Sequence, residues 1–150
     1  MADLAPIRRF VELTRGLAVA SVARDDGHVA SSLVNAGLVD HPTGGGEVVG
    51  FVVRADARKA AHLRRRPHAT LVWPSGWRWV GVSGPVELAG PDDPLPGLAG
   101  DEVPGLLRRV FQGAGGTHDD WPTYDRVMAE ERRLAVLVRP ERVYGNHQGA

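Results

Sequence analysis

The feature that most constrains the fold is a series of short apolar runs separated by turn-forming residues. Asp26 and Gly27, between the runs 17–24 and 28–39, predict a β-hairpin because this pair tolerates the positive φ angles of a tight turn. The run 47–54 is apolar on both faces, which is typical of a central strand. The whole pattern predicts about six strands: residues 17–24, 28–39, 47–54, 68–74, 77–90 and 133–145.

Helical spacing of apolar residues separates these runs at several points. It predicts helices at residues 5–16, 57–66, 103–111 and 119–131. Strands joined mostly by hairpins, with helices outside them, predict an antiparallel barrel or strongly curved sheet of the α+β class. No composition shift or internal repeat divides the chain, so residues 1–150 are expected to form a single domain.

Composition narrows the possible partners and the compartment. Eighteen basic and eighteen acidic residues balance, so we expect neither a nucleic-acid partner nor an anionic membrane partner. No apolar run approaches the roughly 20 residues of a membrane span, and no signal-peptide pattern begins the sequence. The absence of cysteine is consistent with a cytoplasmic protein. The six histidines show no spacing typical of metal ligands.

Lys59 is the only lysine among the eighteen basic residues. It follows Arg58 near the start of the predicted helix 57–66, where the helix dipole and unpaired backbone N–H groups disfavour cations. Two positive charges here are explained if an anion binds between them, and the alternative is that both side chains point to water. Because the chain otherwise uses arginine, the compact charge of a lysine favours a phosphate-sized ligand.

Three other residue types are candidates for contact with a planar ligand. Trp77 and Trp79 are expected on one face of a strand, where they either wall a ring system or belong to a barrel core or dimer contact. Trp73 is assigned to the core. Asn35 interrupts an apolar run, so its amide needs a partner, which is either a ligand ring or a neighbouring backbone group.

Four stretches together resemble the split β-barrel flavin and deazaflavin oxidoreductases, the pyridoxamine-5'-phosphate-oxidase-like family. The stretches are LAVASVARDDGHVASSLVNAGLV, FVVRADARKAAHLRRRPHATLVW, SGWRWVGVSGPVELAG and THDDWPTYDRVMAEERRLAVLVRPERVYG, which cover most of residues 17–145. The resemblance is greatest to the branch that uses the deazaflavin coenzyme F420. It implies a split antiparallel β-barrel with Greek-key-like connections and peripheral helices.

The resemblance also implies a cofactor site. Arg58 and Lys59 would bind the cofactor phosphate, with Ala57 standing where the family often has a serine and Arg54 able to offset the lost hydroxyl. The ring would lie along residues 34–36, and Asn35 stands where flavin-binding relatives tend to carry a basic residue. The full set of expected cofactor contacts is Val34, Asn35, Ala36, Val52, Val53, Arg54, Arg58, Lys59, Trp77 and Trp79.

The function implied is an F420-dependent reductase that transfers a hydride to an unsaturated small-molecule acceptor, with the protein as a homodimer. The alternatives are an FMN-dependent oxidase or reductase of the same fold, or a protein that binds the cofactor without catalysis. No residue is assigned a catalytic role, because the cofactor supplies the chemistry. Residues 91–116 are expected to shape the acceptor site. The basic run 64–66 is either a solvated helix end or a contact for the acidic cofactor tail.

Overall fold

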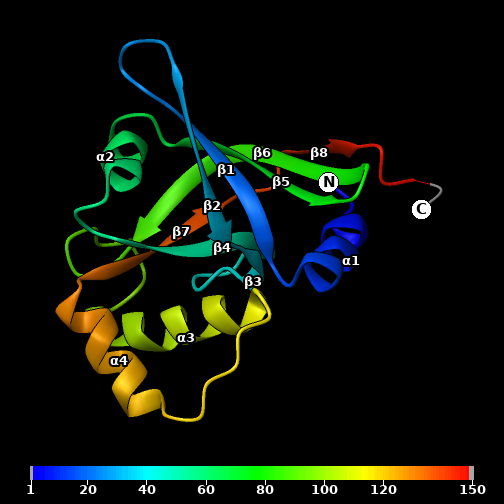
Figure 1. Ribbon diagram of the computed structural model, residues 1–150. Helices are drawn as coiled ribbons and strands as arrows, with labels where there is room; N and C mark the ends of the chain where they lie inside the picture. Colours follow the sequence, from blue (N-terminus) through cyan, green and yellow to red (C-terminus); the bar gives the residue numbers. More distant parts are fainter. Residues whose placement is uncertain (1, 149–150) are drawn as a thin grey trace.

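The computed structural model describes residues 2–148, which form an α+β fold of eight strands and four α-helices (Figure 1). The strands are β1 (Leu17–Ala23), β2 (Val29–Asn35), β3 (Gly37–Asp40), β4 (Glu47–Arg54), β5 (His68–Ser75), β6 (Arg78–Ala89), β7 (Arg133–Val138) and β8 (Arg142–Gly145). The helices are α1 (Ala5–Thr14), α2 (Arg58–Arg65), α3 (Val103–Gly113) and α4 (Trp121–Glu130), and a 3-10 turn precedes α3 at Gly100–Glu102.

The strands form one antiparallel sheet that curves into a split barrel. Its order is β2-β1-β5-β6-β7-β4-β3, with β8 paired to the first half of β6. The two ends of this path, β2 and β3, are consecutive in the chain and are joined by Ala36 alone. Between residues 2 and 148 no ladder joins the two ends, so the barrel is not closed. The predicted α+β class and split antiparallel barrel are therefore confirmed.

The predicted single strand 28–39 is wrong, because the chain leaves the first sheet edge at Ala36 and begins the opposite edge at Gly37. The reason is a close backbone contact with the end of α3. A Cβ atom at position 37 would lie 2.0 Å from the carbonyl oxygen of Gly113, so only glycine fits there. The predicted bend at Pro140 divides the last run into β7 and β8, which accounts for eight strands instead of about six.

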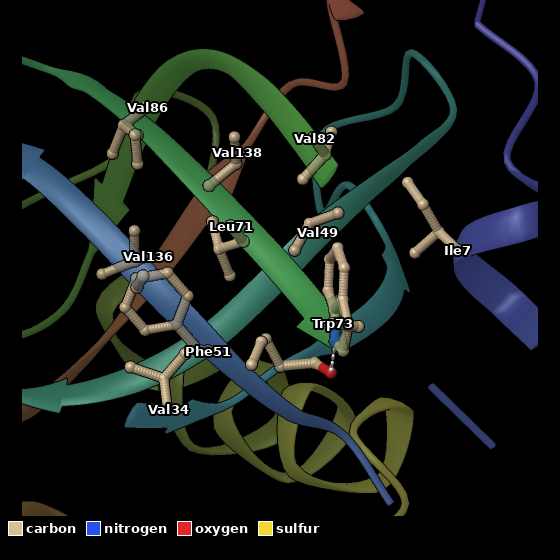
Figure 2. Close-up of a cluster of buried hydrophobic side chains, with 14 of the residues drawn as sticks. Ile7, Val34, Val49, Phe51, Leu71, Trp73, Val82, Val86, Val136 and Val138 are labelled. Carbon is tan, nitrogen blue, oxygen red and sulfur yellow. Dashed lines mark hydrogen bonds between the residues drawn. The ribbon is translucent and has the colours of Figure 1, made fainter. Parts of the chain in front are cut away.

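The main core fills the barrel interior, and two helices close its ends. Phe10 on α1 and Leu63 on α2 are both fully buried in the same cluster as the inward side chains of the sheet. Trp73 lies in this cluster as predicted, and its indole N–H donates to the carbonyl oxygen of Ala36 (3.2 Å, Figure 2). This bond attaches the middle of the sheet to the junction between its two edges.

The outside of the barrel has one covered half and one bare half. Helices α3 and α4 pack over β3, β4 and β7, where Leu106 and Val110 meet the outward side chains of Val48 and Leu137 in a second cluster. No described helix buries the outer face of β2, β1, β5, the first half of β6 and β8. The helices therefore protect one side of the sheet and leave five neighbouring strands uncovered.

Candidate functional site

A cleft of about 550 Å³ lies between the β1–β2 hairpin and the first turn of α2, and we call it the anion cleft. Ser31 and Ser32 of β2 line one wall, and Arg58, Lys59 and His62 of α2 line the other. Val22, Arg24, Ala30 and Ala57 complete the lining. The sheet edge and the helix end thus bring hydroxyls and cations to one concave surface.

The first turn of α2 has no side-chain cap and no acidic residue of its own. Ala57 is the N-cap in an extended conformation, and as an alanine it provides no side-chain acceptor for the first backbone N–H groups. The first turn contains no acidic residue. Free N–H groups and the helix dipole together attract an anion at this position.

Lys59 adds an unneutralised charge to the same point. Among residues 2–148, neither Arg58 nor Lys59 forms an ion pair with a carboxylate, although most other arginines do. Burial lowers the pKa of Lys59, because desolvation disfavours its charged form. A partly buried ammonium at a positive helix end is unfavourable unless an anion compensates it, so the cleft fits a phosphate group.

Arg54 does not join this cluster. Its guanidinium bonds to Asp56 (3.1 Å) and Glu131 (3.3 Å), and it borders a different depression, beside Arg132. It stands at the end of β4, where the side-chain alternation directs it to the side of α4. This arrangement gives no support to the prediction that Arg54 compensates for the hydroxyl missing at position 57. Ser32, in contrast, lines the anion cleft.

The other predicted contacts fall into two groups. The side chains of Val34, Ala36 and Val53 are buried in the barrel core, so only their backbone can face a ligand. Asn35 and Val52 line a second pocket, between the sheet and helices α3 and α4. The amide nitrogen of Asn35 donates to the carbonyl oxygen of Arg15 (2.9 Å), which is the neighbouring-backbone alternative of the sequence analysis.

The two tryptophans are not equivalent. Trp77 lies in the turn between β5 and β6 and is 94% exposed, so it does not share a strand face with Trp79. Trp79 is half-buried on β6 and packs edge-on against Tyr144 of β8, with 5.8 Å between ring centroids. Neither residue lines the anion cleft of its own chain.

The basic run at the end of α2 is used for structure. Arg65 and Arg66 both approach Asp25 at the tip of the β1–β2 hairpin (3.0 and 3.5 Å), and Arg64 forms a two-pronged bond with Asp93 (2.8 Å for both). These pairs hold the hairpin tip against α2 at the rim of the anion cleft. All three arginines are exposed, so the run is the solvated helix end of the first alternative, with surface ion pairs added.

Sequence reasoning missed Ser31, Ser32, Arg24 and His62 as cleft residues. The signal in the sequence was the adjacent pair Ser31 and Ser32 in the predicted hairpin. In the structure Ser31 pairs with Ser21 in the ladder, and their hydroxyl oxygens are 2.8 Å apart. Two adjacent serines on an otherwise apolar strand indicate a polar environment on at least one face. Within residues 2–148, no group of three or more His, Asp or Glu side chains could hold a metal ion, and no helix has the length and hydropathy to cross a bilayer.

Comparison with solved structures identifies the fold. A conserved hypothetical protein, Rv2991 from Mycobacterium tuberculosis, superposes with a TM-score of 0.68 at 19% identity, covering 99% of this chain and 87% of that one. A pyridoxamine 5'-phosphate oxidase-related, FMN-binding protein from Nostoc punctiforme gives 0.59 at 13% identity, covering 95% and 84%. An F420 reductase gives 0.56 at 16% identity, covering 88% and 92%. The chain has the fold of the pyridoxamine-5'-phosphate-oxidase-like proteins.

The same fold also occurs with a different cofactor. A heme-binding protein from Mycobacterium smegmatis superposes with a TM-score of 0.64 at 16% identity, over all of this chain and 57% of that one. No model of a protein family matches the chain. Among curated proteins, a ribosomal RNA large subunit methyltransferase K/L from Allochromatium vinosum is 35% identical over 96 residues, which is 56% of this chain. The chain spans only 12% of that methyltransferase.

Proposed function

We propose that this protein is a coenzyme F420-dependent oxidoreductase that holds the cofactor phosphate in the anion cleft. The observation that carries the proposal is the pair Arg58 and Lys59, which lack carboxylate partners among the described residues at an uncapped helix start. Ser32 offers a hydroxyl and the first turn of α2 offers backbone N–H groups to the same phosphate. FMN carries a phosphate at the corresponding end and is the alternative cofactor.

The protein's part in the reaction is placement. When bound there, the reduced deazaflavin would supply a hydride to one carbon of an unsaturated acceptor, whose other carbon would take a proton from water, a two-electron reduction. The β2 strand leads from Ser31 and Ser32 in the anion cleft to Asn35, four residues and about 13 Å further along. A cofactor bound by its phosphate would follow this strand towards Asn35. We also propose that the protein is cytoplasmic, because a reduced cofactor of this kind would be supplied there.

The bare outer face of the sheet supports a homodimer. The strands β1, β2 and β5 contain no Asp, Glu, Lys or Arg, although only their inner faces meet the core. One row crosses five strands through Leu33, Val19, Val72, Gly81 and Tyr144, which the ladders place side by side. We call this surface the open face; it is uncharged over β1, β2 and β5, and Arg142 of β8 stacks on the Tyr144 ring at its edge.

A second copy of the chain is the partner that fits the open face best. Leu17, Val29 and Leu33 are large apolar side chains exposed on β1 and β2, and contiguous apolar surface of this kind marks an interface. The strands β1, β2 and β5, which carry no charge, can meet their own copies across a two-fold axis without opposing like charges. We propose that in such a dimer Trp77 or Trp79, which do not line the anion cleft of their own chain, contacts the cofactor bound to the partner chain.

The test of the proposed site is calorimetric titration of the protein with F420, FMN and hemin. We expect F420 to bind the native protein, and the double variant Arg58→Ala, Lys59→Ala to lose at least about 100-fold in affinity because two charge-assisted contacts to phosphate disappear. The matched control is Arg109→Ala, Arg126→Ala, which removes the same charge from α3 and α4 and should bind normally.

Three results would change this assignment. Stronger binding of FMN than of F420, with the same loss in the Arg58 and Lys59 variant, would move the protein to the flavin alternative. Unchanged cofactor binding in that variant would show that the phosphate lies elsewhere. Binding of hemin with no response to either phosphate-bearing cofactor would overturn the proposal and favour a heme-binding role.

A further inference from the structure

A second pocket of about 360 Å³ lies where the ends of β2, β4 and β7 meet helices α3 and α4, and we call it the helix pocket. Its walls are largely apolar. They are formed by Val52 on the sheet, Phe111 on α3, and Tyr124, Val127 and Met128 on α4. The volume and the apolar lining suit a small organic molecule.

The walls of the helix pocket are held in place by contacts between the two helices. The rings of Phe111 and Tyr124 lie 5.2 Å apart, and Trp121 packs edge-on against Tyr124 at the same centroid distance. Arg108 of α3 and Asp125 of α4 form a two-pronged ion pair of 2.9 and 2.5 Å. A pocket whose walls are already cross-linked pays little ordering entropy when a ligand binds.

Tyr124 contributes a ring to this pocket and not a free hydroxyl. Its O–H donates to the carbonyl oxygen of Leu107 (3.2 Å), and burial raises its pKa. The group therefore stays protonated and occupied at neutral pH. A ligand in the helix pocket meets a flat apolar surface at this position and obtains no proton from it.

The polar groups of the helix pocket gather at one end. Arg133 bonds to Glu131 (2.9 Å), and the same carboxylate also accepts from Arg54 (3.3 Å). Arg54 and Arg133 are direct ladder partners, so two like charges face each other and share one carboxylate between them. That carboxylate satisfies only part of the Arg133 guanidinium, which leaves N–H donors for an oxygen of a ligand.

Asn35 connects the helix pocket to the anion cleft. It lines the helix pocket and ends the strand whose earlier residues, Ser31 and Ser32, line the anion cleft. Its amide nitrogen is used by the Arg15 carbonyl, so its side-chain oxygen remains available. The two sites are thus adjacent along one sheet edge, about 13 Å apart along β2.

We infer that the helix pocket binds the hydride acceptor, and that the acceptor is a flat, conjugated, mostly apolar molecule with a carboxylate or carbonyl oxygen directed at Arg133. This inference rests on the proposed function, because the acceptor role requires a cofactor ring near Asn35. The aromatic and aliphatic walls take the conjugated part of the acceptor. Arg133 fixes its orientation.

The chain contains two methionines, Met1 and Met128, so methyl labelling gives a single reporter inside the helix pocket. The probe is 2-naphthoate, with its neutral amide 2-naphthamide for comparison. We expect 2-naphthoate to shift the Met128 methyl resonance saturably and to bind about tenfold more tightly than the amide, because a charged hydrogen bond to Arg133 adds roughly 1.5 kcal/mol.

Three variants test separately the volume of the helix pocket, the charge of Arg133 and the anion cleft. Val127→Trp should fill the pocket and abolish the Met128 shift for both probes. Arg133→Leu should remove the preference for naphthoate while leaving the amide affinity unchanged, and Arg126→Leu, on the exposed side of α4, should change neither. The Arg58→Ala, Lys59→Ala variant should bind naphthoate as the native protein does.

Failure of the inference is distinguishable from failure of the proposed function. A Met128 methyl that does not respond to naphthoate, or a response lost in the Arg58→Ala, Lys59→Ala variant, would overturn the helix pocket as the acceptor site even if F420 binds. A normal Met128 response in a protein that binds neither F420 nor FMN would instead remove the proposed function and with it the acceptor role.

Discussion

Lys59 lies in the first turn of α2, where the helix dipole makes an unpaired cation unfavourable, and burial lowers its pKa. Burial favours the neutral amine, whereas a bound phosphate would favour the ammonium. The Lys59 ammonium therefore lowers the stability of the free protein and would strengthen the binding of a phosphate. Such an exchange of stability for function is common at binding sites.

The depressed pKa of Lys59 predicts how cofactor affinity depends on pH. Phosphate binding stabilises the protonated form, so affinity is fully present below the pKa of Lys59 in the free protein and falls as the pH rises through it, by up to about tenfold per pH unit. In Lys59→Arg the charge persists to higher pH and the decline should vanish. Titration calorimetry from pH 7 upward compares the two slopes, and parallel profiles would show that Lys59 does not contact the phosphate.

Helix α2 has only eight residues, too few to persist alone in water, so its position depends on the contacts of its two faces. Ala60 and Leu63 are fully buried in the barrel core, and the far end is tied to Asp25 on the hairpin. The anion cleft lies between these two attachments. Its shape is therefore set by packing that is separate from the charged residues that would bind a ligand.

Leu63→Ala should cost about 2–5 kcal/mol of the free energy of unfolding, since it leaves a cavity at the point where α2 closes the barrel. Urea denaturation followed by circular dichroism measures the loss. The matched control on the same helix is Arg65→Ala, whose exposed ion pair with Asp25 should contribute less than about 1 kcal/mol. A similar small effect for both variants would mean that α2 is not anchored by its apolar face.

The elements that sequence predicts well are those defined by neighbours in the chain. The hairpin at Asp26 and Gly27 and the helix predicted at residues 119–131, which begins after the N-cap Asp120, both depend on residues within a few positions of one another. The break at Ala36 depends instead on the contact of Gly37 with Gly113, and the use of Arg54 depends on Glu131, 77 positions away. Neither partner is visible in a local pattern.

The same distinction holds for the candidate site. Arg58 and Lys59 could be found because their position at a helix start is itself a local anomaly. The prediction that Trp77 lies on a strand is wrong. A local pattern does not fix the end of a turn to within one residue, and a shift of one residue moves a side chain from the sheet to solvent. The helix pocket could not be predicted, since Asn35, Phe111 and Met128 meet only after three distant segments have packed.

At the scale of the whole molecule, the open face is the side of the sheet that no described helix covers. Leu33 is 72% exposed at its centre row, so replacing it should not disturb the folded single chain. Leu33→Glu should convert a dimer into a monomer because it places two like charges together across a two-fold axis. Light scattering coupled to gel filtration measures the mass.

Leu13→Glu is the matched control for this whole-molecule prediction. Leu13 is an exposed leucine of α1 that lies outside the rows of the open face, and its replacement should leave the mass unchanged. A native protein that is already monomeric at micromolar concentration would remove the dimer proposal. A dimer that persists in Leu33→Glu would place the interface on another surface.

The joining of both sheet edges by Ala36 has a consequence for synthesis. The first 54 residues contain both outer edges of the sheet, while β7, the strand that must bind the inner edge of β4, begins only at Arg133. A nascent chain therefore exposes the apolar strand β4 with one edge unpaired until β7 has also left the ribosome. Strands that wait for distant partners fold slowly and are prone to aggregation, so this topology makes β7 decisive for whether the first 54 residues remain in solution.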